Sequence, residues 1–229
     1  MLKLLAAWLV SFMLVQAPPD RPQYIKEAKE TVDEAKARYE SIATDITAVV
    51  FDEDEPALFK GPDGRLKSTA VILSIMSHES SFRRDVDLGL GPLAKGDGGR
   101  SVCMMQLNIG GGRTGDWNKV QHRFAYDKDP PAEIEKGWTA TEIKADRKKC
   151  IRAGLRIMRL SFALTADRPV KEWLNVYASG KADAGVQASG NRMGLALSWY
   201  TKNAPTFTDD DILKAMRPTV TVLPVVATK

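Results

Sequence analysis

The stretch that decides the fold is Ser68–Phe82, STAVILSIMSHESSF, which is followed after a glycine-rich passage by Ser101–Asn108, SVCMMQLN. The first part predicts a short helix, because three apolar residues precede Glu79 at helical spacing and share its face. They are Ile72, Ile75 and Met76. A carboxyl group among apolar side chains at the carboxyl end of a helix is expected to favour its protonated form, which can donate a proton near neutral pH. The alternative is that Glu79 simply ends a core helix and points into solvent.

The residues around this stretch predict a mainly α chain with at most a small β element. Residues 85–100 are rich in Gly and Asp and predict a loop, whereas residues 101–108 read as a short strand or an extended turn. Apolar residues recur at helical spacing in five further segments. These helices are expected over 24–50, from Thr141 to 162, and over 170–178, 191–201 and 209–216. The first is amphipathic and about seven turns long, so it packs on the domain or against a partner helix.

The composition indicates an ordinary soluble globular protein. The chain has 229 residues, of which 44% are hydrophobic and 27% are charged, and its net charge is +4. This mild positive charge favours an anionic surface such as a bacterial cell wall. No block of Lys and Arg is interleaved with aromatic residues, so a nucleic-acid partner is not expected. The sequence also lacks a cofactor motif and metal-ligand spacing, so we expect neither a cofactor nor a metal.

Residues 1–17 have the composition of a secretory signal peptide. Lys3 precedes an apolar run over residues 4–15, and the small residue Ala17 stands at the exit. The expected location is therefore outside the cytoplasm, in the periplasm or the cell envelope. The run is shorter than the roughly 20 residues that a membrane-spanning helix needs, and an uncleaved N-terminal membrane anchor is the alternative. The rest divides into a spacer with the amphipathic helix over 18–65, the main domain over 66–204, and a C-terminal helix and tail over 205–229.

Four short motifs follow one another along residues 66–201. A Glu-Ser pair ends a helix, a Met-Gln pair lies in a compact turn, a third motif begins a helix, and a Tyr precedes the last turn. They are His78–Phe82, Ser101–Asn108, Cys150–Leu155 and Val176–Gly180. In the order and approximate spacing of these motifs, the chain resembles the superfamily of soluble lytic transglycosylases and goose-type lysozymes.

The motifs depart from the family's pattern at three positions. Cys103 stands where the family has Gly, Cys150 stands where it has Asn, and Ala178 replaces the Asn that follows the Tyr. Two cysteines in an exported protein favour a disulfide, and two buried free thiols are the alternative. Because both cysteines occupy motif positions, the resemblance implies that they lie close together. We therefore expect a disulfide between Cys103 and Cys150 that braces the cleft.

The resemblance implies a lysozyme-like fold that cleaves the β-1,4 bond between N-acetylmuramic acid and N-acetylglucosamine in peptidoglycan. Glu79 would protonate the leaving oxygen and then act as a base on the muramyl 6-hydroxyl, which gives a 1,6-anhydro product without water. Four further residues are expected to form the substrate-binding part of the site: Ser101, Met105, Gln106 and Tyr177. Met105 would pack beneath the cleft, and Tyr177 would hydrogen-bond Glu79. The alternative roles are turn capping for Ser101 and Gln106 and core packing for Tyr177.

Two other functions stay open at this point. A hydrolysing lysozyme would combine Glu79 with a carboxylate of the following loop. The candidates are Asp85, Asp87 and Asp97, which are otherwise solvated loop residues. A non-catalytic wall-binding or envelope-assembly module would keep the fold without turnover. The helix over 24–50 would also suit a domain carried by a secretion apparatus or a phage particle. Three tryptophans could stack on sugar rings or belong to the core: Trp117, Trp138 and Trp173.

Overall fold

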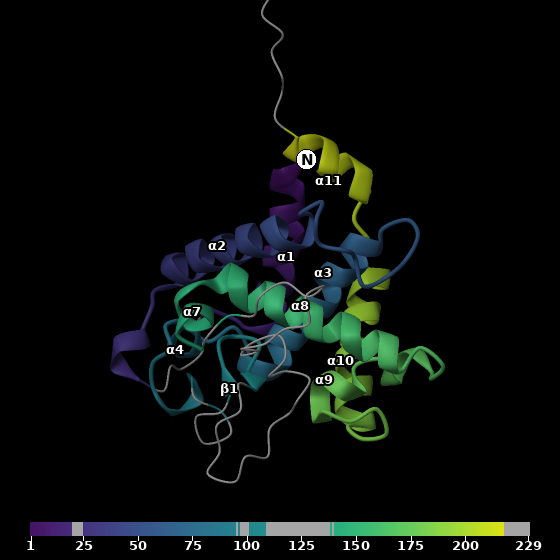
Figure 1. Ribbon diagram of the computed structural model, residues 1–229. Coiled ribbons are helices and arrows are strands. Elements are labelled where there is room, and N and C mark those ends of the chain that lie inside the picture. The colour runs from purple at the N-terminus through teal and green to yellow at the C-terminus, as the bar shows by residue number, and fades with distance from the viewer. Residues whose placement is uncertain (20–24, 95, 97–100, 109–137, 139, 218–229) are drawn as a thin grey trace, which may run out of the picture.

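The computed structural model describes residues 1–19, 25–94, 96, 101–108, 138 and 140–217 (Figure 1). Helices make up most of this part of the chain, and the sheet within it has two short strands, β1 (Ser101–Val102) and β2 (Leu107–Asn108). The strands pair antiparallel, with Val102 opposite Leu107. The prediction of a mainly α chain with at most a small β element is confirmed.

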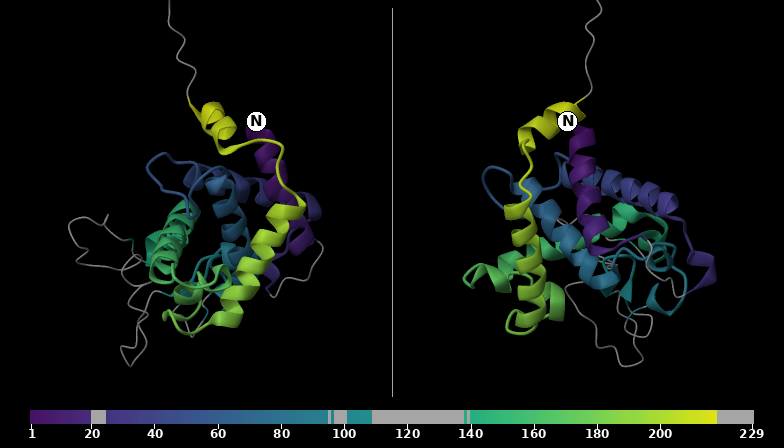
Figure 2. Two further views of the ribbon diagram at one scale, coloured as in Figure 1. Left: turned by 90° about the vertical axis from the view of Figure 1, so that its right-hand side faces the viewer. Right: turned by 180° about the vertical axis from the view of Figure 1, so that it is seen from behind.

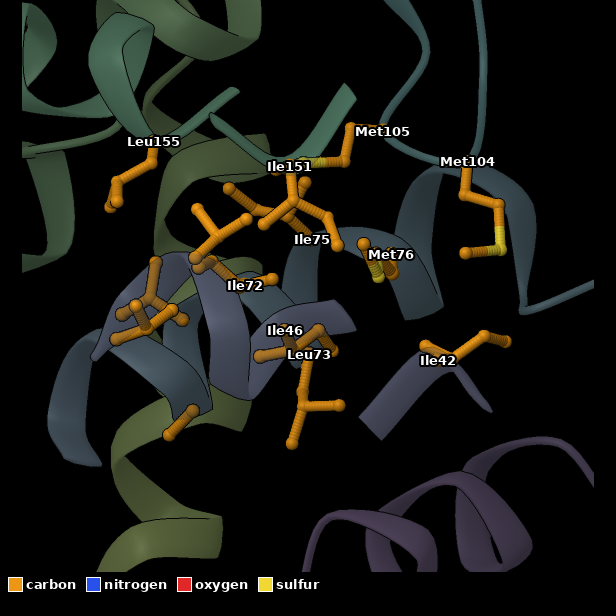
Figure 3. Close-up of a cluster of buried hydrophobic side chains, with 14 of the residues drawn as sticks. Ile42, Ile46, Ile72, Leu73, Ile75, Met76, Met104, Met105, Ile151 and Leu155 are labelled. Atoms are coloured by element: carbon orange, nitrogen blue, oxygen red, sulfur yellow. The ribbon is translucent and has the colours of Figure 1, made fainter. Parts of the chain in front are cut away.

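The helix α3 (Gly64–Ser80) lies at the centre of the molecule. It packs against α1 (Leu2–Gln16), α2 (Val32–Val50) and α10 (Val186–Lys202). Because neighbours cover it on several sides, its buried residues surround the helix axis and do not form a single stripe. Figure 3 shows part of this core between α3, α2, α8 (Arg147–Leu164) and the turn between the two strands. The α3 residues labelled there are Ile72, Leu73, Ile75 and Met76.

The first turn of α3 is capped by a residue far away in the sequence. The carboxylate of Asp209 accepts hydrogen bonds from the backbone N–H groups of Arg65 at 2.7 Å and Leu66 at 3.0 Å. Asp209 is the first residue of α11 (Asp209–Met216). Burial raises the pKa of Asp209, although these two hydrogen bonds act in the opposite direction. The cap therefore satisfies free amides of α3 and also ties the C-terminal helix to the centre of the fold.

The long helix expected over 24–50 is shorter in the structure. Residues Lys26–Ala28 form a separate 3₁₀ turn, η1, and α2 begins after Thr31. Thr31 and Glu34 form a capping box, in which each side chain accepts a hydrogen bond from the backbone N–H of the other. From there α2 packs against α1, α3 and α8, so its apolar face is covered within this chain.

The segment predicted to be a signal peptide or a membrane anchor forms α1, and one side of this helix belongs to the core. Its fully buried side chains are Leu5, Leu9, Phe12 and Met13. The ring of Phe12 makes edge contacts with Phe82 and Trp199, and the Tyr39 hydroxyl donates to the Ala17 carbonyl at 2.6 Å. Export and cleavage of this segment stay predictions. Among the described residues, no helix has the length and apolar character needed to cross a membrane.

The helix expected from Thr141 to 162 is divided into two. The structure has α7 (Ala140–Ala145) and then α8, which continues to Leu164. Asp146 separates them and caps α8, since its side chain accepts hydrogen bonds from the backbone N–H groups of Lys148 and Lys149. α8 packs against α2 on one side and against α9 (Asn175–Ser179) on another.

Short elements connect the long helices and complete the fold. They are α4 (Arg84–Asp87) and η2 (Pro92–Ala94) after α3, and η3 (Val170–Glu172) before α9. At the other end of the molecule, α11 lies beside the first turns of α1 (Figure 2). Residues from Leu5 in α1 to Ile212 in α11 share one hydrophobic core. The helices α1, α2 and α11, which lie outside residues 66–204, thus all pack against α3.

Candidate active site

Glu79 lies in the last turn of α3, where the helix leaves the core. Ser81 and Phe82 follow with positive φ angles of 49° and 52°, and Phe82 is fully buried, so the chain turns sharply at this point. The Glu79 side chain keeps 18% exposure. It opens onto a pocket of about 440 Å³. Other residues that line this pocket are Ser81, Arg83, Leu93 and Gln106.

The carboxylate of Glu79 forms an ion pair with Arg192 of α10. Arg192 Nη2 and Nε donate to Glu79 Oε1 at 2.6 Å and 3.1 Å. A guanidinium at this distance favours the ionised form of a carboxyl group. The expectation of a protonated Glu79 rested only on the apolar face and the end of its helix. It did not include the positive charge of Arg192 beside the carboxylate. Arg192 is 113 residues away from Glu79 in the chain, so no local pattern connects the two.

Tyr177 of α9 is buried close to this ion pair. Its hydroxyl donates to the backbone carbonyl of Met105 at 2.7 Å. Burial raises the pKa of the Tyr177 hydroxyl well above its ordinary value, and the charge of Glu79 raises it further, whereas Arg192 lowers it. Tyr177 is therefore a neutral donor that joins α9 to the turn between β1 and β2.

The turn between β1 and β2 presents Gln106 to the pocket. Gln106 has a φ of 45°, and its side-chain amide donates to the carbonyl of Cys103 at 3.0 Å. Ser101 is 2% exposed and Met105 is fully buried in the core. Of the four residues expected to bind substrate, Gln106 lines the pocket, whereas Ser101, Met105 and Tyr177 are buried.

A disulfide ties this turn to α8. The Sγ atoms of Cys103 and Cys150 are bonded at 2.10 Å, and the two Cα atoms are 6.3 Å apart. The Cys103 carbonyl also accepts the backbone N–H of Gln106 at 3.0 Å. The bond expected between the two cysteines is thus present in the structure, and it is linked through a single turn to a residue that lines the pocket.

The loop carboxylates considered for a hydrolysing enzyme are held by arginines. Asp85 is fully buried, and Arg83 Nε and Nη2 donate to its two oxygens, both at 2.9 Å. Asp87 accepts from Arg147 Nε and Nη2 at 3.0 Å and 2.8 Å. Bidentate pairs of this kind hold both carboxyl groups in place. Asp97 lies outside the described residues.

The tryptophans that could either stack on sugars or belong to the core do not line the Glu79 pocket where the structure describes them. Trp173 packs against Phe162 and lines a separate hollow of about 640 Å³. Trp138 lies under the guanidinium of Arg156, at 5.1 Å. Trp117 lies outside the described residues. Within the described part of the chain, no group of three or more His, Cys, Asp or Glu side chains could hold a metal ion.

The described pocket therefore offers one carboxyl group, Glu79, which is paired with Arg192, and one amide, Gln106. A carboxyl group in such a position can donate a proton to a bound molecule or accept one from it. Comparisons with protein-family models, with curated proteins and with solved structures give no match to this chain.

Proposed function

We propose that the protein is a lytic transglycosylase with a lysozyme-like fold. It would cleave the β-1,4 bond between N-acetylmuramic acid and N-acetylglucosamine in peptidoglycan, with Glu79 as both acid and base. The observation that carries the proposal is the position of Glu79, at the end of a buried helix and open to a pocket of about 440 Å³ that Gln106 also lines. A pocket of this size accommodates a small ligand.

The chemistry needs a single carboxyl group. Protonated Glu79 gives its proton to the oxygen between the two sugars as the bond from that oxygen to C1 of the muramyl residue breaks. The leaving sugar departs with a free 4-hydroxyl. Glu79, now a carboxylate, takes the proton of the muramyl 6-hydroxyl while O6 bonds to C1, so the 1,6-anhydro product forms and the acid is restored.

The engagement of the loop carboxylates supports this route over hydrolysis. Most glycoside hydrolases need a second carboxylate beside the bond that they cleave. Asp85 and Asp87 each have both oxygens in hydrogen bonds from an arginine, Arg83 and Arg147 respectively. Neither carboxylate could take part without first breaking such a pair.

We further propose that the protein acts in the periplasm or cell envelope, where its partner is the peptidoglycan glycan strand. A net charge of +4 suits an anionic wall. A secretion apparatus or a phage particle is a further candidate partner, because a wall-cleaving domain would open a local passage for either assembly.

The test is digestion of purified peptidoglycan followed by mass analysis of the released fragments. We expect 1,6-anhydromuropeptides, whereas reducing ends would identify a hydrolase. Glu79→Gln keeps the size of the side chain but removes the acid, so it should abolish release and leave the circular dichroism spectrum unchanged. The matched control is Glu40→Gln, since Glu40 is an exposed carboxylate of α2. If Glu79→Gln releases fragments at the rate of the control, the proposal is wrong.

A second candidate function is a wall-binding module without turnover. The ion pair between Glu79 and Arg192 favours it, because a guanidinium at 2.6 Å disfavours the protonated form of a carboxyl group, and only that form can donate a proton. In that case the protein would sediment with purified walls, no fragment of either kind would be released, and Glu79→Gln would sediment to the same extent.

A further inference from the structure

Arg192 is held by hydrogen bonds at both ends of the residue. Ser74 Oγ of α3 donates to its backbone carbonyl at 2.7 Å. Its guanidinium donates through Nη1 to the carbonyl of Ala188 at 2.9 Å, while Nε and Nη2 reach Glu79 Oε1. The two paired side chains are only 14% and 18% exposed, so solvent screens this pair less than it screens an ion pair on the surface.

The other titratable groups that the structure describes near Glu79 do not cancel the effect of Arg192 on the charge of Glu79. Arg83 lines the same pocket, but Asp85 accepts two of its hydrogen bonds and balances its charge. Tyr177 is neutral at ordinary pH because burial raises the pKa of its hydroxyl. The exposed side chain of His78 has its Nδ1 2.8 Å from the Ser74 carbonyl. Arg192 is thus a cation that donates two hydrogen bonds directly to the Glu79 carboxylate.

We propose that Arg192 holds Glu79 ionised in the free protein, so the first proton transfer requires the guanidinium to move off Glu79 Oε1. Arg192 is a positioning residue in this scheme, because it acts on the substrate only through Glu79. When Nε and Nη2 leave Glu79, the guanidinium can keep its hydrogen bond from Nη1 to the Ala188 carbonyl. The catalytic consequence rests on the proposed function, whereas the charge state of Glu79 can be measured without turnover.

The first step needs the protonated form of Glu79, whereas the positive charge of Arg192 stabilises the ionised form. Removal of the cation is therefore expected to raise the pKa of Glu79 by about one to three pH units. Each unit increases the protonated fraction near neutral pH about tenfold. In the wild-type protein, activity should fall as pH rises through the Glu79 pKa, and the same fall should occur at higher pH once the cation is gone.

The charge inference is tested by following the Glu79 side-chain carboxyl carbon by NMR as a function of pH, with the resonance assigned by its loss in Glu79→Gln. Arg192→Met removes the cation and keeps most of the side-chain length, and Arg192→Lys keeps the charge. We expect the titration midpoint to rise by at least one unit in Arg192→Met and to stay close to the wild-type value in Arg192→Lys. An unchanged midpoint in Arg192→Met overturns the inference. If Arg192→Met does not fold, Arg192→Gln carries the same test, because its amide can still donate to the Ala188 carbonyl.

The catalytic consequence is tested by the pH profile of kcat/KM for fragment release. In Arg192→Met the high-pH limb should move to higher pH together with the NMR midpoint. Release near neutral pH should then increase about tenfold for each pH unit of that shift. If Arg192 had only a structural role, its substitution would lower kcat/KM at every pH and leave the high-pH limb of the profile at the same pH. That result would contradict the inference. If neither the wild type nor any Arg192 variant releases fragments, the proposed function fails, and the NMR titration alone decides the role of Arg192.

Discussion

Gly154 of α8 lies directly against the end of the Met105 side chain. A Cβ atom at position 154 would come within 2.5 Å of both Met105 Sδ and Met105 Cε. Met105 is fully buried, and its carbonyl accepts the hydrogen bond from Tyr177. A side chain at position 154 would therefore force the end of the Met105 side chain to shift within the packed core.

Gly154→Ala should destabilise the protein, although Ala is the better helix former. Overpacking of a filled core costs about 1–3 kcal/mol, and the gain in helix propensity returns about 1 kcal/mol at most. Urea unfolding measures the net loss. The matched control is Gly194→Ala in α10, where a Cβ would meet no atom within 4 Å, and this change should stabilise the protein slightly. Equal effects of the two substitutions would contradict the packing described for Met105.

Removal of the disulfide should lower the free energy of unfolding by about 4 kcal/mol, according to the chain-entropy estimate for a loop of this size. The bond joins Cys103 and Cys150, which are 47 residues apart. The measurement is urea unfolding of the wild type with and without reductant. The control is the double variant Cys103→Ala and Cys150→Ala, which should match the reduced wild type and should not respond to reductant. A reduced wild type as stable as the oxidised one would show that the bond adds nothing to folding.

If α1 is part of the folded protein, Phe12→Ala should lower the free energy of unfolding by about 3–5 kcal/mol, which is the usual cost of truncating a large buried side chain. Phe12 is fully buried and contacts the rings of Phe82 and Trp199. Val15→Ala is the control, because Val15 lies on the same helix and is 62% exposed. Urea unfolding measures the loss, and the intact mass of the isolated protein distinguishes this role from that of a removed leader. If intact mass shows that the isolated protein begins after Ala17 and its helices still unfold cooperatively, α1 is dispensable to the core.

Tyr200 should make stability depend on pH in the alkaline range. Burial raises the pKa of the Tyr200 hydroxyl from 10.0 to about 12, and its hydrogen bond to Asp63 adds to the increase. A pKa raised by folding stabilises the protein fully below the unfolded value, and this contribution is lost as pH rises through the folded value. The difference in free energy of unfolding between wild type and Tyr200→Phe should therefore shrink between pH 10.0 and about 12. A difference that is constant over this range would argue against the assignment.

Local periodicity was enough to predict the helical class and the place of Glu79. The apolar residues Ile72, Ile75 and Met76 precede it at helical spacing, and in the structure they fill the core around α3. The same reasoning could not identify Arg192 or the Asp209 cap, because both partners come from segments more than a hundred residues away. Long-range pairs of this kind depend on how helices pack, and no pattern within a single segment records that packing.

The N-terminal segment shows a different limit of sequence patterns. An apolar run after a lysine is typical of an exported leader, and an apolar run is equally suited to a helix that packs on a core. Residues 4–15 satisfy both descriptions, and α1 packs against α2, α3 and α11 and also contacts Trp199 of α10. The loop carboxylates are a similar case, since Asp85 and Asp87 look solvated in sequence but are held by arginines in the fold.

The contacts of α1 also have a consequence for how the chain is made. Trp8 Nε1 donates to the carbonyl of Asn203, 195 residues later, and Phe12 meets Trp199 near the end of α10. At a synthesis rate of roughly 5–20 residues per second, α1 leaves the ribosome about 10–40 s before these partners exist. During that interval the part of its apolar face that α10 covers in the folded protein is exposed, so a factor that binds nascent apolar helices can reach it before α10 does.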